Sequence, residues 1–244
     1  MQPGLASTPY CGTAPAPGGV AWNLDPMLGA ALLAGLLLAW RLAGASGDRR
    51  WLAVGWIVLA STLISPLCNL SVALFSARVA QHLVLLAVAA PMLALALPIY
   101  RHGPAGMAAA AAAFAAALWA WHLPGPYALT FRSDIAYWAM QGSLVATATW
   151  LWHGLLLGAA RRPEVAILAG LATAAQMGAL GALLTFTPRP LFVPHALSTL
   201  PWGLTPLEDQ QLGGLLMWVP GGLAFALLAL SALARALRAE PAAR

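Results

Sequence analysis

The sequence predicts an all-α integral membrane protein, a bundle of seven transmembrane helices with the N-terminus outside and the C-terminus in the cytoplasm. Three observations predict this class. Hydrophobic residues make up 61% of the 244 residues and charged residues only 8%, against about 25% charged residues in soluble domains. Apolar runs recur along the chain, and a hydrocarbon core about 30 Å thick takes about 20 such residues per helix. The basic residues lie between these runs and not in a cluster, which argues against a nucleic-acid-binding surface.

Helix start and stop signals define the predicted spans. Asp25 can cap the first helix, and Pro26 suits its first turn. The second span ends before Pro66 and the third before Pro98, because a residue that precedes proline disfavours the helical conformation. The shortest span is the second, at about 21 Å, and a re-entrant segment is the alternative for it. The seven predicted spans cover residues 26–40, 51–64, 72–97, 104–121, 134–157, 163–186 and 206–233.

The arginines favour seven spans over six and set the orientation. With seven spans, three of the 12 basic residues lie on one side, Arg78, Arg132 and Arg189. The other nine lie on the opposite side, which is the cytoplasmic one by the positive-inside rule: Arg41, Arg49, Arg50, Arg101, Arg161, Arg162, Arg235, Arg238 and Arg244. We therefore expect a tail on the outer side over residues 1–25, a membrane domain over 26–234 and a cytoplasmic tail over 235–244.

Polar side chains are costly inside a bilayer, so those near the spans are the default functional candidates. The predicted orientation turns His82, His122, Met217 and Cys68 toward the outer face, and His195, Met27, Met140 and Met177 lie on the same side. Thiol and thioether sulfur together with imidazole suit Cu(I). We take the first four as candidate ligands of a transiently held copper ion. The alternatives are an interfacial histidine, a methionine that fills space and, for Cys68, a disulfide with Cys11 or neither role.

Two acidic residues begin the seventh span. Thr205, Pro206 and Glu208 match a capping box, in which Glu208 reaches back to the helix start. Asp209 is also favourable near the positive N-terminus of a helix, but this accounts only in part for an acidic residue at this position. Arg78 is a charge at the start of a span and needs a partner, so we predict an ion pair between Arg78 and Asp209, with Glu208 as the other possible acid.

No enzyme motif stands out. The sequence has no G-x-S-x-G, no H-E-x-x-H and no Walker loop. All seven acidic residues lie at span ends or in loops, which removes the usual groups of a proton relay. We therefore expect a protein that is not an enzyme.

Nine motifs follow one another along most of the chain, from residue 22 to about 225. They are Trp22–Pro26, Ser65–Leu67, Phe75–Ala77, Gln81–Leu83, Ala89–Pro91, Trp121–Pro124 with Tyr127, Leu184–Phe186, Pro206–Gly214 and Met217–Pro220. Each is weak alone. In this order the set resembles the CtaG-type cytochrome c oxidase assembly factors, a bacterial family of seven-span membrane proteins.

The resemblance implies a chaperone-like role in the respiratory chain, in which the protein helps copper reach a haem–copper oxidase. It implies oxidase subunits as partners in the plasma (inner) membrane of a bacterium, where residues 1–25 would form a periplasmic tail. The apolar composition and the spread of the arginines give the lipid bilayer as the other partner, and no nucleic acid. Two departures from the family pattern concern possible ligands. Where family members often have His-Met-x-x-His, this chain has Arg78, Val79 and only His82. Where they often have a second histidine pair, it has Tyr137, Trp138, Gln141 and Gly142. The resemblance thus implies either a different metal site or a docking role.

Two other functions stay open at this point. A haem-binding electron carrier needs two histidines at one depth, whereas His82 is predicted near the outer face and His153 near the inner face. A small-solute or metal transporter is weakened by the shortage of charge within the spans and by the lack of a repeat between the two halves.

Overall fold

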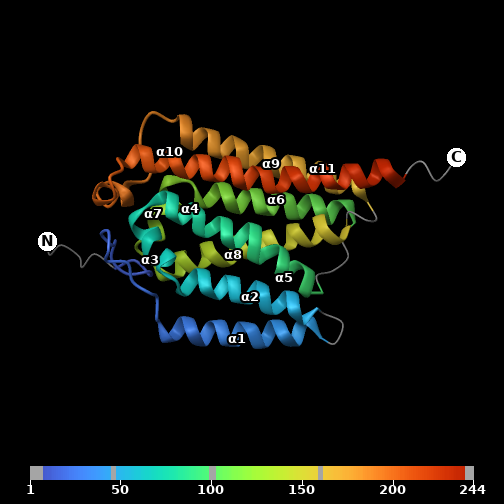
Figure 1. Cartoon of the computed structure of the whole chain (residues 1–244), viewed down its shortest axis with the longest axis horizontal. Helices are drawn as coiled ribbons and strands as arrows, with labels where there is room; N and C mark the ends of the chain where they lie inside the picture. Colours follow the sequence, from blue (N-terminus) through green and yellow to red (C-terminus); the bar gives the residue numbers. More distant parts are fainter. Residues whose placement is uncertain (1–7, 45–47, 99–102, 159–161, 240–244) are drawn as a thin grey trace.

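The computed structural model describes residues 8–44, 48–98, 103–158 and 162–239. Within these ranges the chain is helical and contains no strand, which confirms the all-α class. Long helices lie side by side along the molecule (Figure 1): α1 (Pro26–Ala43), α2 (Arg49–Ile64), α4 (Phe75–Leu83) continued by the π-helical η1 (Val84–Ala89) and α5 (Ala90–Ala96), α6 (Pro104–Trp121), α8 (Asp134–His153), α9 (Pro163–Phe186), and α10 (Pro206–Leu216) continued by the π-helical η5 (Met217–Gly221) and α11 (Gly222–Ala239).

One end of the bundle, which we call the loop end, gathers the tail over residues 8–25, the short helices α3 (Pro66–Ala73) and α7 (Pro124–Leu129), and the loop over residues 187–205 (Figure 1). Hydrogen bonds join these segments. The Asn69 amide donates to the carbonyl of Cys11, and the Trp202 indole donates to that of Pro15. The loop end is therefore an ordered layer over the helix ends.

By length and composition, the chain is a multi-pass membrane protein. Five helical segments are long and apolar enough to cross a membrane, and α2 with α3, bent by 49°, makes a sixth if the pair counts as one span. The five are Pro26–Ala43, Phe75–Ala96, Pro104–Trp121, Pro163–Phe186 and Pro206–Ser231. The polar residues of α8 keep it out of this set. The count of seven spans and the orientation stay predictions, and three of the arginines behind them, Arg101, Arg161 and Arg244, lie outside the described residues.

Most predicted boundaries hold to within a few residues, and the exceptions are the start of the third span and the end of the seventh. The ranges of α6 and α9 match the sequence-based ranges, because each begins at a proline in its first turn. The third span was predicted from residue 72, and this is wrong: Leu74 is extended, with φ −124° and ψ 131°, and separates α3 from α4. At the C-terminus, α11 continues to Ala239, into the segment predicted as a cytoplasmic tail.

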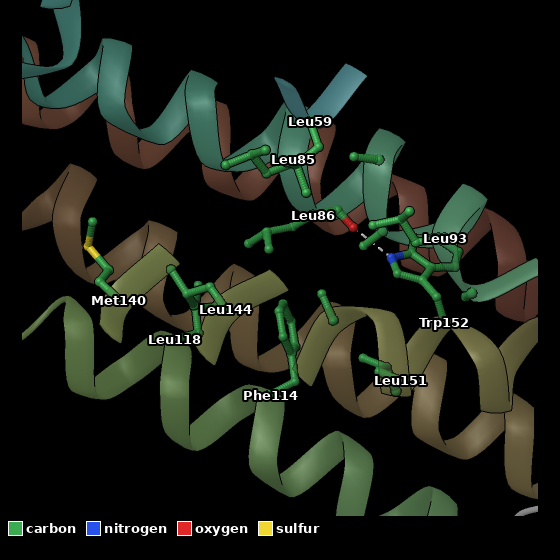
Figure 2. Packing of buried hydrophobic residues seen from close by; sticks show 14 of the residues in the cluster. Leu59, Leu85, Leu86, Leu93, Phe114, Leu118, Met140, Leu144, Leu151 and Trp152 are labelled. Carbon is green, nitrogen blue, oxygen red and sulfur yellow. Dashed lines mark hydrogen bonds between the residues drawn. The ribbon is translucent and has the colours of Figure 1, made fainter. Parts of the chain in front are cut away.

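Small residues and a π-helical turn shape the packing. A Cβ added at Gly181 of α9 would lie 2.8 Å from the carbonyl oxygen of Gly214 on α10, so these two helices meet through glycines. Between α8 and η1, the Trp152 indole donates to the Leu86 carbonyl at 2.7 Å (Figure 2). The wider π turn leaves this carbonyl accessible to a neighbouring helix. The cluster of buried residues drawn in Figure 2 also includes Leu59, Leu85, Leu93, Phe114, Leu118, Met140, Leu144 and Leu151, and it extends along the bundle from Trp152 to Met140.

Candidate metal site

Two of the candidate ligands come together inside the bundle. His82 lies on α4 and His122 directly follows α6, and their ring centroids are 6.5 Å apart at an interplanar angle of 76°. Both side chains are buried, with 5% and 6% of their surface exposed. The two imidazoles, one from α4 and one from the C-terminal end of α6, thus lie next to each other.

A small cavity of about 20 Å³ lies between the two rings and two methionines. Met177 comes from α9, and Met217 is the first residue of η5. Pro220 lies inside η5 and offers no N–H to the helical ladder. The volume suits one particle about the size of a water molecule. The rest of the lining is apolar: Val79, Leu83, Leu86, Ala87, Leu118, Gly221 and Phe225.

The hydrogen bonds show which ring nitrogens can donate an electron pair. Nδ1 of His122 lies 2.7 Å from the Leu118 carbonyl. A carbonyl only accepts, so Nδ1 carries the proton and Nε2 the lone pair. Burial lowers the pKa of His122 to about 4, which keeps the ring neutral. Neither ring nitrogen of His82 has a hydrogen-bond partner. A buried imidazole without partners is costly, and a bound cation would satisfy it.

The donor set is therefore two imidazoles and two thioethers. Within the described ranges, no group of three or more histidine, cysteine, aspartate or glutamate side chains is arranged to hold a metal ion, so the site depends on the methionine sulfurs. Met177 was one of several outer-side methionines in the sequence, and no spacing distinguished it. Its place in the cavity follows from the packing of α9 against η5.

Cys68 is not a ligand in this structure. Its sulfur is bonded to that of Cys11, which ties the N-terminal tail to α3 across 57 residues of sequence. The Tyr137 hydroxyl lies 3.3 Å from the sulfur of Cys11 and 3.6 Å from that of Cys68. A disulfide leaves no thiolate for a metal. Of the three possibilities for this residue (a metal ligand, a disulfide or neither), the structure shows the disulfide.

The predicted ion pair between Arg78 and Asp209 is not present in the structure. Arg78 is buried at 2% exposure, donates to the Thr130 hydroxyl at 2.8 Å, and lies 4.2 Å from the ring centroid of Phe131 and 5.1 Å from that of Tyr127. Aromatic faces thus take the place of a carboxylate.

Asp209 has a different role. Its carboxylate accepts from the backbone N–H groups of Phe75 and Ser76 and from the Ser76 hydroxyl. It therefore caps α4, whose own N-cap residue, Leu74, has no capping side chain. Glu208 forms the predicted capping box with Thr205, and this prediction is confirmed.

His195 contacts Tyr127, which packs against Arg78, and it does not line the cavity. Its Nδ1 lies 3.2 Å from the Ala73 carbonyl and its Nε2 lies 2.7 Å from the Tyr127 hydroxyl. Nδ1 therefore donates, and Nε2 accepts from the tyrosine. Burial, and then the charge of Arg78, lower the pKa of His195 to about 3. The ring joins α7, α3 and the loop over residues 187–205.

Comparison with known proteins gives one family. The model of the cytochrome c oxidase caa3 assembly factors matches residues 33–239. No curated protein and no solved structure gives a significant match.

Proposed function

Because the chain belongs to the cytochrome c oxidase caa3 assembly factor family, we propose that it assists the maturation of such an oxidase by holding Cu(I) transiently. The proposal places the cargo in the cavity between His82, His122, Met177 and Met217. The observation that carries it is the buried imidazole of His82, which has no hydrogen-bond partner and lines a cavity sized for one ion.

The chemistry of the donors supports Cu(I) over other metals. Thioether sulfur is a soft ligand and suits Cu(I), whereas Mg²⁺ and Ca²⁺ prefer oxygen. All four donors are neutral, so a bound ion would keep its charge in apolar surroundings. A divalent ion would meet a far larger penalty there than a monovalent one. A set of neutral donors also limits the affinity for Cu(I). A carrier that must release its cargo requires such a limit.

The position of the cavity supports delivery at the outer face of the inner membrane. His122 directly follows α6, near the loop end of the bundle (Figure 1). The arginine distribution predicts that this end faces the periplasm. A haem carrier is disfavoured, because a cavity of about 20 Å³ has no room for a porphyrin. No observation favours a solute transporter.

Anaerobic titration of the purified protein with Cu(I) against a chromogenic chelator tests the proposal. We expect one Cu(I) per chain, and a loss of at least tenfold in affinity for His82→Ala and for Met217→Leu. Met140→Leu is the matched control, since Met140 is fully buried but outside the cavity. Absence of Cu(I) binding, or unchanged affinity in His82→Ala, would leave only a docking role, which co-purification with oxidase subunits would test.

A further inference from the structure

Arg78 is a buried cation whose charge no acidic side chain neutralises. Its Nη1 donates to the Thr130 hydroxyl, and its Nε is buried without a hydrogen-bond partner. Among the residues that the structure describes, no carboxylate forms an ion pair with it. The aromatic faces of Tyr127 and Phe131 attract the cation but carry no net charge. A buried charge without a counter-charge is costly, and packing alone does not require one here.

The charge lies next to the candidate metal site. Arg78 and His82 are four residues apart on α4, so they share one face of the helix with Cβ atoms about 6 Å apart. Val79, between them, lines the cavity. The guanidinium group packs against Tyr127 of α7, on the loop-end side of the cavity. Helix geometry therefore places the charge roughly 8–10 Å from an ion that His82 would hold.

At this separation the repulsion between Arg78 and a bound cation is large. Two unit charges about 8–10 Å apart, at an effective dielectric constant of about 20, change a binding constant by about tenfold to thirtyfold. A buried imidazole outside the cavity already shows such an effect, since burial, and then the charge of Arg78, lower the pKa of His195 to about 3. A proton and Cu(I) carry the same charge, so the field of Arg78 opposes both.

The acid that reaches α4 does not cancel this field. The Asp209 carboxylate accepts from the backbone N–H groups of Phe75 and Ser76, where its charge offsets the positive end of the helix. The charge of Arg78 is left to act on the cavity.

We propose that Arg78 lowers the affinity of the cavity for Cu(I) by electrostatic repulsion and so keeps the ion releasable. This inference rests on the proposed Cu(I) site. The imidazoles and thioethers select the ion, and Arg78 weakens its binding without occupying a coordination position. The repulsion acts on the loaded site and not on the empty one, so it favours transfer to a receiving protein. A divalent ion would meet twice the repulsion, which adds to the selectivity for Cu(I).

Anaerobic Cu(I) titration of the full chain against a chromogenic chelator tests the role of the charge. We expect Arg78→Gln to bind one Cu(I) at least tenfold tighter than the wild type, because the amide can still donate to Thr130 but carries no charge. Arg78→Lys keeps the charge and should bind as the wild type does. Arg189→Gln is the matched control. It makes the same substitution at an exposed arginine of the loop over residues 187–205, where solvent screens the charge, and it should leave the affinity unchanged.

The outcomes separate this proposal from the proposed function. If the wild type binds Cu(I) and Arg78→Gln binds it no tighter, the role of Arg78 is overturned and the Cu(I) site stands. Equally tightened binding in Arg78→Gln and Arg78→Lys would trace the effect to packing and would also overturn it. Binding by Arg78→Gln alone would support the repulsion but reject Cu(I) carriage by the natural chain, and binding by neither would overturn both. If Arg78→Gln does not fold, Arg78→Leu supplies the uncharged side chain.

Discussion

The carboxylate of Asp209 on α10 accepts a hydrogen bond of 2.6 Å from the backbone N–H of Phe75, the first residue of α4. The two residues are 134 positions apart. A helix start in an apolar environment has unpaired N–H groups, and here a neighbouring helix satisfies them. The contact fixes α4 against α10. His82 lies on α4, and Met217 directly follows α10, so the contact also positions these two candidate ligands.

Removal of this cap should destabilise the protein and loosen the candidate site. In Asp209→Ala, two backbone N–H groups and the Ser76 hydroxyl lose their acceptor, and we expect a loss of about 2–4 kcal/mol in the free energy of unfolding. Cu(I) affinity should fall with it, because α4 positions His82. Denaturant unfolding and Cu(I) titration measure the two effects. Glu208→Ala is the control, since it removes only an exposed capping box, at a cost of about 1 kcal/mol. Equal losses in the two variants would contradict this role of Asp209.

Gly221 controls the space available to a methionine ligand. A Cβ at this position would lie 2.8 Å from Met177 Cε and 3.0 Å from Leu83 Cδ2. Both are ends of flexible side chains, so Gly221→Ala should fold normally but displace the Met177 thioether. We expect Cu(I) affinity to fall by about threefold to tenfold with little change in melting temperature.

The neighbouring glycine provides the control for this experiment. A Cβ at Gly222 would meet only the Ala174 carbonyl oxygen, at 3.7 Å, which is ordinary contact. Gly222→Ala should therefore bind Cu(I) as the wild type does. If Gly221→Ala and Gly222→Ala gave the same affinity, Met177 would not be a ligand.

The disulfide should matter for stability and not for copper. A cross-link across 57 residues contributes about 4 kcal/mol in the chain-entropy description. The double variant Cys11→Ser, Cys68→Ser should therefore unfold at a clearly lower temperature in a thermal scan. Its Cu(I) stoichiometry should equal that of the oxidised wild type. A reductant should lower the melting temperature of the wild type but not that of the double variant. Loss of Cu(I) binding in the double variant would return Cys68 to the ligand set.

The sequence predicts the helices better than their contacts. Proline and capping residues are local signals, which is why the ranges of α6 and α9 follow from the sequence. The break at Leu74 has no such signal, because the residue that caps α4 is Asp209, far away in the chain. Attraction of opposite charges suggested an Arg78–Asp209 pair, but the backbone N–H groups compete for the same carboxylate, and aromatic rings cover the guanidinium.

In the candidate site, too, the sequence predicts the residues better than their contacts. Residue chemistry is visible in the sequence, so His82, His122 and Met217 were proposed from it. The meeting of their side chains depends on how α4, α6, α9 and η5 cross, which no local pattern encodes. Met177 was therefore not distinguished from the other methionines, and Cys68 was left with three possible roles.

Folding stability should decrease as the pH falls below about 6.5, in part through His195. The pKa of this histidine is about 3 in the folded protein, where burial and Arg78 disfavour the charged ring, and about 6.5 in the unfolded chain. Between these values the unfolded state binds the extra proton, so the stabilisation is complete above pH 6.5 and is lost as the pH falls toward 3. The slope contributed by one such group is about 1.4 kcal/mol per pH unit. His195→Gln keeps an acceptor for Tyr127 and a donor for Ala73 but does not titrate. Its free energy of unfolding, measured between pH 4 and 6, should fall less steeply than that of the wild type by about this amount, and parallel pH profiles would show that His195 is protonated in the folded state.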